Sequence, residues 1–289
     1  MCSGKMPPTE LQVREIIDRA LAEDLGQGDV TTEALINGSR QGTGLITAKQ
    51  EGVVAGMEVA MQVFRRVDPK LDVELLLEDG ARVEPGSKIA RVTGSIGSIL
   101  KAERVALNFL QRISGIASET NRYVMRVEGL PVRIMDTRKT TPGLRSLEKY
   151  AVKAGGGMNH RMHLADGILI KDNHLAVLSA QGLGIEETIA MARRNAPAEL
   201  TVEVEVGTVS AALEAVQAGA DIIMLDNMGL DDMRQAVQVI AGRALVEASG
   251  GITLDAVRTV AETGVDRISI GALTHSPRAL DISLEIDPQ

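Results

Sequence analysis

The sequence contains almost no aromatic residues and a single cysteine. Aromatic side chains make up 1% of the 289 residues, and tryptophan is absent. Because single-stranded nucleic acids stack their bases on aromatic rings, and phosphate backbones attract positive charge, a net charge of −8 argues against a nucleic-acid partner. Cys2 alone can build neither a disulfide framework nor a cysteine-based metal site within one chain, which agrees with a reducing compartment.

Long hydrophobic runs are also missing. The apolar stretches are short and broken by charge, well below the ~18 residues needed to span a bilayer, and the amino terminus lacks a signal-peptide pattern. With 44% hydrophobic and 24% charged residues, the chain can bury the core of a globular protein. We therefore expect a cytoplasmic protein that has no membrane partner.

The first third of the sequence changes from a helical to a strand-like pattern. After an expected loose start over residues 1–8, a helix is predicted over Leu11–Leu25. Short apolar pieces separated by Gly, Pro and Asp then indicate a small α+β domain. These expected strands are Leu45–Ala48, Val53–Ala55, Leu71–Leu77 and Ile89–Val92. Apolar residues at helical spacing from Ala102 to Ile113 predict a bridging helix with Arg104 on its polar face.

From Val132 onward, short apolar strands alternate with amphipathic helices. The expected strands are Val132–Met135, Ile168–Ile170, Leu200–Val206, Asp221–Leu225, Ala244–Ala248 and Arg267–Ile270. The expected helices are Gly143–Lys153, Ile185–Asn195, Val209–Ala218, Leu230–Ile240 and Leu254–Thr263. A repeat of roughly 20 residues is typical of a parallel βα barrel rather than of a broad open sheet, although the pattern alone does not settle closure.

Polar residues follow these strands, at the end where the side chains of a βα barrel converge on one mouth. In chain order they are Asp136, Arg138 and Lys139; Lys171 and Asp172; Glu203 and Glu205; Asp226; Glu247 and Ser249; and Gly271. The cations among them, joined by the loop residues His160 and Arg161, can hold carboxylates or phosphates. Glu205 and Asp226 can bind magnesium or stabilise a developing cation. The alternative is a set of ion pairs that crosslink the top of the barrel.

Two late glycine loops suit a phosphate group. Ser249, Gly250 and Gly251 follow the fifth strand and open a predicted helix, so their backbone amides and the helix amino terminus can hold an anion. Gly271, after the sixth strand, offers a second close backbone approach. Each glycine could equally serve a tight corner.

His160 lies in a glycine-rich loop, where a histidine is more often a surface residue than a catalyst. His163 and His174 lie nearby without the spacing of metal ligands, so no zinc site is predicted.

At this point the motifs resemble one family, quinolinate phosphoribosyltransferase, nearly from end to end. They are Glu23-Asp24-Leu25-Gly26, Gly28-Asp29-Val30-Thr31-Thr32, Glu103-Arg104, Asp136-Thr137-Arg138-Lys139-Thr140, Asn159-His160-Arg161, Leu169-Ile170-Lys171-Asp172-Asn173-His174, Glu203-Val204-Glu205-Val206, Leu225-Asp226-Asn227, Ser249-Gly250-Gly251 and Gly271-Ala272-Leu273-Thr274-His275-Ser276. No site position departs from the family pattern.

The resemblance implies an architecture of two domains. It predicts an α+β sandwich over residues 1–115, against which the tail 275–289 is expected to pack, and an open βα barrel of about seven strands over 116–274. The seventh strand is expected around Ile116–Val127 or in a short stretch not recognised. The resemblance also implies a homodimer, or a dimer of dimers, in which Arg104 reaches the neighbouring subunit's site. A solvated arginine is the alternative for Arg104.

The activity implied is phosphoribosyl transfer from phosphoribosyl pyrophosphate to quinolinate with decarboxylation. The products are nicotinate mononucleotide, pyrophosphate and carbon dioxide, in NAD biosynthesis. The resemblance implies that the two carboxylates of quinolinate bind Arg104, Arg138, Arg161 and Lys171, with Lys139 and His160 alongside, and this number of cations favours the diacid over nicotinate. The 5-phosphate is expected on Ser249, Gly250, Gly251 and Gly271. Lys139, Glu205 and Asp226 are the expected catalytic residues, and Glu205 and Asp226 the expected magnesium ligands.

Two other functions remain open from the sequence. One is a phosphoribosyltransferase that acts on nicotinate or another pyridine acid. The other is a non-catalytic protein that binds a phosphate ligand, which is disfavoured because Glu205 and Asp226 would place carboxylates beside an anion without need of a metal.

Overall fold

The computed structural model describes residues 10–36 and 40–288, which form two compact units. Unit 1 contains the described residues up to Asn121, together with Thr140–Gly156 and the residues from Ala272 onward. Unit 2 contains Arg122–Lys139 and Gly157–Gly271. The division expected between residues 115 and 116 falls inside one long helix, α4 (Ile96–Arg126). The predicted loose start at residues 1–8 and Cys2 lie outside the described residues.

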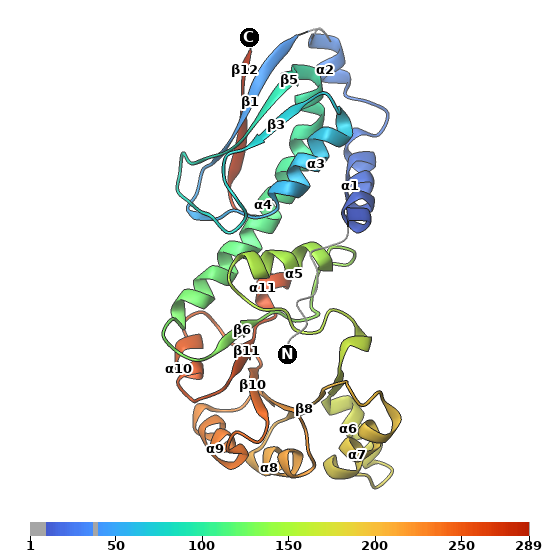
Figure 1. Cartoon of the computed structure of the whole chain (residues 1–289), viewed down its shortest axis with the longest axis vertical. Helices are drawn as coiled ribbons and strands as arrows, with labels where there is room; N and C mark the ends of the chain where they lie inside the picture. Colours follow the sequence, from blue (N-terminus) through green and yellow to red (C-terminus); the bar gives the residue numbers. More distant parts are fainter. Residues whose placement is uncertain (1–9, 37–39, 289) are drawn as a thin grey trace. The chain divides into compact units, whose positions relative to one another are not determined.

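Unit 1 is built on a four-stranded antiparallel sheet in the order β12-β1-β5-β3 (Figure 1). These strands are β1 (Gln41–Ala48), β3 (Asp72–Leu75), β5 (Lys88–Ser95) and β12 (Ile282–Pro288), and a separate pair joins β2 (Gly52–Val53) to β4 (Arg82–Val83). Every second residue of β1 is buried, as expected for a strand with one face on the core. The tail returns to this sheet, because β12 pairs with β1 from Ala48 opposite Ile282 to Gly42 opposite Pro288.

The helices of unit 1 are α1 (Glu10–Leu25), α2 (Val30–Leu35), α3 (Met57–Val67), α4, α5 (Arg145–Ala154) and α11 (Ala272–His275). Helix α4 packs closely on β1, where a Cβ added at Gly42 would lie 2.8 Å from the Ile96 side chain. Asp29 caps α2 by accepting a hydrogen bond from the Thr32 N–H at 2.9 Å. Helices α2 and α3 were not predicted, because α2 has only six residues and α3 lies between two strand-like pieces.

The predicted seventh strand at Ile116–Val127 is wrong, because α4 continues through this stretch to Arg126. Its hydroxyl side chains bond to carbonyls one turn earlier: Ser118 Oγ donates to Ser114 O at 2.7 Å and Thr120 Oγ1 to Ile116 O at 2.8 Å. Such bonds satisfy small polar side chains inside a helix, so these residues do not end it.

Unit 2 contains a parallel six-stranded sheet in the order β6-β11-β10-β9-β8-β7. The strands are β6 (Arg133–Met135), β7 (Ile168–Ile170), β8 (Val202–Val206), β9 (Ile222–Asp226), β10 (Leu245–Ser249) and β11 (Arg267–Ser269). Each predicted strand overlaps one of them, which confirms the βα alternation. The connecting elements are the 3-10 helix η1 (Leu164–Asp166) and helices α6 (Asp172–Ser179), α7 (Ile185–Asn195), α8 (Val209–Gln217), α9 (Leu230–Ile240) and α10 (Val257–Ala261).

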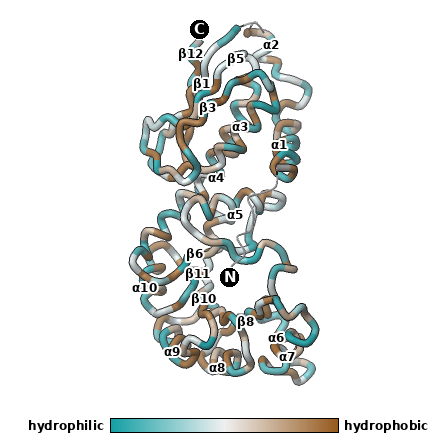
Figure 2. The backbone as a smooth tube through the Cα atoms, in the orientation of Figure 1, coloured by the Kyte–Doolittle hydropathy of each residue, from teal (hydrophilic) through white to brown (hydrophobic). Residues whose placement is uncertain are grey.

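The alternation along β8 decides which residues can form a site. Val202, Val204 and Val206 are buried on one face, so Glu203 and Glu205 share the other. Along the helices hydrophobic residues (brown) mix with hydrophilic ones (teal), as expected for amphipathic helices (Figure 2). No helix in the described part of the chain is both long enough and apolar enough to cross a membrane.

Candidate active site

The carboxyl ends of the unit 2 strands bring many of the predicted site residues together. Asp226 and Ser249 are the last residues of β9 and β10 and lie opposite each other in the sheet register. Glu205 occupies the second-last position of β8, and Lys171 directly follows β7 as the residue before α6. Because parallel strands end at one edge, these residues face a common region, as the sequence predicted.

Glu205 and Asp226 are two carboxylates close enough for their negative charges to repel each other. Burial raises the pKa of Glu205, and the charge of Asp226 raises it further, whereas Lys171 lowers it. The Lys171 Nζ lies 3.9 Å from Glu205 Oε2. A divalent cation would relieve the repulsion, and carboxylate oxygens are the ligands that magnesium prefers, so the pair fits the proposed metal ion.

The Ser249-Gly250-Gly251 loop packs directly against the residue after Asp226. Asn227 N–H donates to Ser249 O at 3.0 Å, and its side-chain Nδ2 donates to Asp226 Oδ2 at 2.7 Å. A Cβ added at Gly250, whose φ is +101°, would lie 2.3 Å from Asn227 Oδ1. Gly250 therefore permits a backbone approach that no other residue would allow.

The prediction that this loop opens a helix is wrong in detail. Helix α10 begins only at Val257 and has five residues, whereas a helix was expected over Leu254–Thr263. A turn over residues 254–256 separates it from the glycines. Phosphate binding at this loop would therefore depend on its own backbone amides rather than on a helix terminus.

Arg138 and Arg161 are close enough for their charges to interact. Burial lowers the pKa of Arg161, and the positive charge of Arg138 lowers it further. Arg161 Nη1 also donates to Gly167 O at 2.9 Å, which holds its guanidinium beside the start of β7. Two neighbouring cations that repel each other suit an anionic ligand.

The remaining predicted site residues are Lys139, Gly271 and Arg104. Lys139 is exposed after β6, and Gly271 follows β11 before α11. Arg104 belongs to unit 1, where it is exposed on α4. Its polar-face position is confirmed, and its expected role requires a second subunit.

His160 is not the surface residue that its loop suggests, because its side chain is only 11% exposed. One residue of the segment Gly157–Arg161 pairs with the sheet: Met158 forms an isolated parallel bridge to Met135 of the edge strand β6. The buried Asp136 accepts hydrogen bonds from Asn159 Nδ2 at 2.5 Å and from His160 N–H at 2.8 Å. A backbone anchored in this way lets the imidazole point inward.

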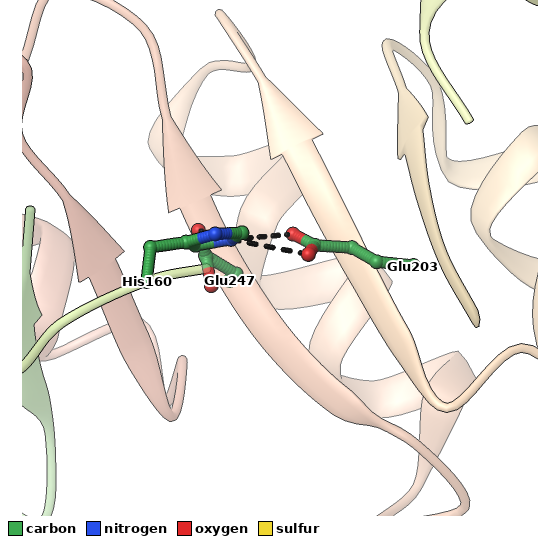
Figure 3. Close-up of side chains that lie close together, drawn as sticks. All are labelled: His160, Glu203 and Glu247. Carbon is green, nitrogen blue, oxygen red and sulfur yellow. Dashed lines mark hydrogen bonds and ion pairs between the residues drawn. The ribbon is translucent and has the colours of Figure 1, made fainter. Parts of the chain in front are cut away.

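Glu203 and Glu247, which the sequence placed at the strand ends without a role, complete a buried cluster with His160. His160 Nε2 lies 3.1 Å from Glu203 Oε2 and 3.5 Å from Glu247 Oε1 (Figure 3). The signal that could have found them is the two-residue period of strands, which puts Glu203 on the face of Glu205 and Glu247 on the face of Ser249.

The cluster also shows that the sheet is strongly curved. Strands β6 and β8 are four positions apart in the sheet order, which is about 19 Å in a flat sheet. A histidine beside β6 could not reach a glutamate of β8 over that distance. The contact between His160 and Glu203 therefore requires the sheet to curl around the cluster.

We expect Glu247 to make the stability of the protein depend on pH. Burial, and then the charge of Glu203, raise its pKa to about 7 from 4.5. Between these values the folded state binds more protons than the unfolded state, so the free energy of unfolding falls as pH rises. Between pH 5 and pH 7.5, the free energy of unfolding measured in urea should fall by roughly 2 kcal/mol more in wild type than in Glu247→Gln.

The exposed Glu262 provides a matched control for that measurement. Glu262→Gln should keep the pH dependence of wild type. Equal pH dependence in wild type and Glu247→Gln would contradict the assignment.

Comparison with known proteins shows which family matches both parts of this chain. The family model for the quinolinate phosphoribosyl transferase N-terminal domain matches residues 29–114, and the model for the C-terminal domain matches residues 116–285. A probable nicotinate-nucleotide pyrophosphorylase (carboxylating) of Bacillus subtilis is 42% identical over 276 residues, covering 96% of this chain and 94% of the relative.

Two further relatives agree. A mitochondrial quinolinate phosphoribosyltransferase (decarboxylating) of Nicotiana glauca is 41% identical, over 96% of this chain and 83% of its own. The crystal structure of NadC from Streptococcus pyogenes superposes with a TM-score of 0.94 at 41% identity, over 99% of this chain and 100% of that one. Both domain models and these relatives lead to one conclusion: this chain belongs to the quinolinate phosphoribosyltransferase family.

Proposed function

We propose that this protein converts quinolinate and phosphoribosyl pyrophosphate to nicotinate mononucleotide, pyrophosphate and carbon dioxide. Family membership supports the reaction class. The observation within the structure that carries it is the Glu205 and Asp226 pair, which lies beside Lys171 and the Gly250 loop. Such a site offers anionic and cationic groups to a substrate that is anionic at both ends and becomes cationic at the reacting carbon.

Quinolinate carries two adjacent carboxylates, and the cations of unit 2 are suited to bind them. Arg138, Arg161 and Lys171 supply donors, with Lys139 alongside, whereas His160 faces Glu203 and Glu247 instead. Nicotinate has one carboxylate and would leave part of this charge unused. The charge count therefore favours the diacid.

The phosphoribosyl group would lie across the same edge of the sheet. Its 5-phosphate would accept hydrogen bonds from the amides of the Ser249-Gly250-Gly251 loop and approach Gly271. Its ribose would face Glu205 and Asp226, which would also hold the magnesium ion that accompanies the pyrophosphate. Bound magnesium would neutralise the charge of the pyrophosphate leaving group.

The chain's own residues would act on the charge that develops during transfer. As the bond to pyrophosphate breaks, positive charge grows at the anomeric carbon, and Glu205 and Asp226 would stabilise it. Lys139 would help to neutralise the departing pyrophosphate. The pyridine nitrogen attacks the anomeric carbon and becomes cationic. That charge stabilises the carbanion left at the neighbouring carbon when carbon dioxide departs, and this carbon then takes up a proton to give nicotinate mononucleotide.

The same proposal covers architecture and assembly. The curved sheet would form the wall of an open barrel of about seven strands, with Gly157–Arg161 between the edge strands β6 and β7. The Met158 bridge to β6 and the Arg161 bond to Gly167 support this placement. The protein would form a cytoplasmic homodimer, in which Arg104 would enter the site of the second subunit. Light scattering would measure the mass of this dimer.

The test is a mass-spectrometric assay of the purified protein with phosphoribosyl pyrophosphate and magnesium. One sample receives quinolinate and a parallel sample nicotinate. Nicotinate mononucleotide with carbon dioxide from quinolinate alone is the expected result. Product from nicotinate would favour the other phosphoribosyltransferase. Magnesium-dependent binding without turnover would favour a binding protein.

A further inference from the structure

Three groups that can each carry a proton meet in the interior of unit 2. The imidazole of His160 comes from the segment before β7, Glu203 from β8 and Glu247 from β10 (Figure 3). Their side chains are 11%, 5% and 0% exposed. The ligand-type atoms of the three lie within 4.8 Å of one another, so by spacing alone they could hold a metal ion. The hydrogen bonds around the ring point to a different role.

The position of the ring proton follows from the backbone. The N–H of Arg161 donates to Nδ1 of His160 at 2.8 Å, so Nδ1 must be an unprotonated acceptor. The ring hydrogen is then on Nε2, which faces Glu203 and Glu247. A metal ion bound to Nε2 would leave the ring hydrogen on Nδ1. Nδ1 could then no longer accept the hydrogen bond from the Arg161 N–H. The cluster is therefore built as a hydrogen-bonded clamp on the imidazole.

The second carboxylate is itself held in place. Ser269 Oγ donates a short hydrogen bond to Glu247 Oε1, the oxygen that also faces Nε2. Glu203 approaches Nε2 with both oxygens, at 3.1 and 3.4 Å. Carboxylates that neighbour a histidine in this way fix the tautomer and direction of its ring.

The clamp is connected to the proposed substrate site through one residue. Nδ1 of His160 binds the backbone N–H of Arg161, and the Arg161 side chain is one of the two cations proposed to hold a carboxylate. If the ring turned away, that N–H would lose its acceptor and the Arg161 backbone would be free to rotate.

We propose that Glu203 and Glu247 are positioning residues that hold the imidazole of His160 and thereby orient Arg161 toward the quinolinate carboxylates. This inference rests on the proposed function. It assigns a role to two residues that need not touch either substrate. Glu203 contributes more than Glu247, because it makes the closer contact with Nε2.

The kinetic test uses Glu203→Ala and its conservative partner Glu203→Gln, which keeps an acceptor of the same size. Glu203→Ala should raise the KM for quinolinate roughly 10- to 100-fold, the effect of losing a hydrogen bond to a charged group, and change the KM for phosphoribosyl pyrophosphate less than about threefold. Glu203→Gln should restore most of the quinolinate affinity, and Glu247→Ala should show a smaller effect in the same direction.

A destabilised control separates positioning from folding. Ile189 is fully buried on α7 and belongs to neither the cluster nor the proposed site, so Ile189→Ala should lower the Tm without altering the ratio of the two KM values. Equal changes of both KM values in Glu203→Ala would overturn the proposal, as would no change in either. If Glu203→Ala does not fold, Glu247→Ala takes its place, with a smaller rise of the quinolinate KM expected and again little change of the KM for phosphoribosyl pyrophosphate.

A spectroscopic test is independent of turnover. The chain has four histidines, so ring nitrogen-15 labelling gives few signals, and His160→Gln identifies the one of interest. Wild type should show His160 with its hydrogen on Nε2, and Glu203→Ala should show a mixture of tautomers. A hydrogen on Nδ1, or tight zinc binding that Glu203→Ala removes, would overturn the clamp. If the labelled ring behaves as expected but no product forms, the proposed function fails while the clamp stands.

Discussion

Replacing Glu205 by Gln and Asp226 by Asn together should lower kcat about a thousandfold. The pair is proposed to face the carbon that becomes positively charged, and each group aimed at developing charge is worth about 10²- to 10³-fold in rate. Two groups that act on the same charge are not additive, so the double variant should lie near the upper end of that range. Steady-state kinetics with saturating substrates measures the effect.

Quinolinate binding should hardly change in the same variant. Lys171 loses its carboxylate partner at 3.9 Å and becomes fully available to an anion, so calorimetry should give a Kd within a few-fold of wild type. The fold should not weaken either, because the substitution removes a carboxylate whose pKa is raised by burial and then by the charge of Asp226. Glu262→Gln is the surface control. Unchanged turnover in the double variant would remove both residues from the proposed mechanism.

Gly250→Ala should lower kcat/KM for phosphoribosyl pyrophosphate at least a hundredfold, whereas Gly251→Ala should stay within about fivefold of wild type. Both glycines have positive φ, +101° and +57°, so alanine costs roughly 1–2 kcal/mol of backbone strain at either position. Only at Gly250 does the new Cβ also meet other atoms, 2.3 Å from Asn227 Oδ1 and 2.8 Å from Asn227 N.

The collision would displace the residue that orients Asp226. Asn227 donates to Asp226 Oδ2, so relieving the overlap should disturb the phosphate loop and the acid pair together. Urea unfolding should show Gly250→Ala about 2 kcal/mol less stable than Gly251→Ala, the usual cost of overpacking. Equal behaviour of the two variants would mean that the loop moves freely and that the approach to Asn227 is unimportant.

The sequence predicted most of the parallel sheet because its strands are short apolar runs bounded by polar ends. It also placed Glu205, Asp226 and Ser249 at one edge, since strand ends are local features. What it missed depends on contacts between distant parts of the chain. His160 looks like a surface residue until Asp136, 24 residues earlier, is found to anchor its backbone.

Helices were misjudged where local signals conflict with packing. The predicted helix ended at Ile113, and the stretch that follows is rich in Gly, Ser and Ala, yet the backbone of α4 continues there and approaches the tail closely. A Cβ added at Gly115 would lie 2.0 Å from the carbonyl oxygen of Arg278. The glycine that weakens the helical pattern is required by this contact, and only the folded tail makes it visible.

The pairing of β12 with β1 has a consequence for synthesis on the ribosome. Residue 41 emerges early, but its sheet partner ends at residue 288, so one edge of that sheet stays open during almost the whole of translation. The strands of unit 2, by contrast, are complete once residue 269 has emerged. The four-stranded sheet should therefore be completed last, and β1, which carries no charged residue, should depend on chaperones to avoid pairing with another nascent chain.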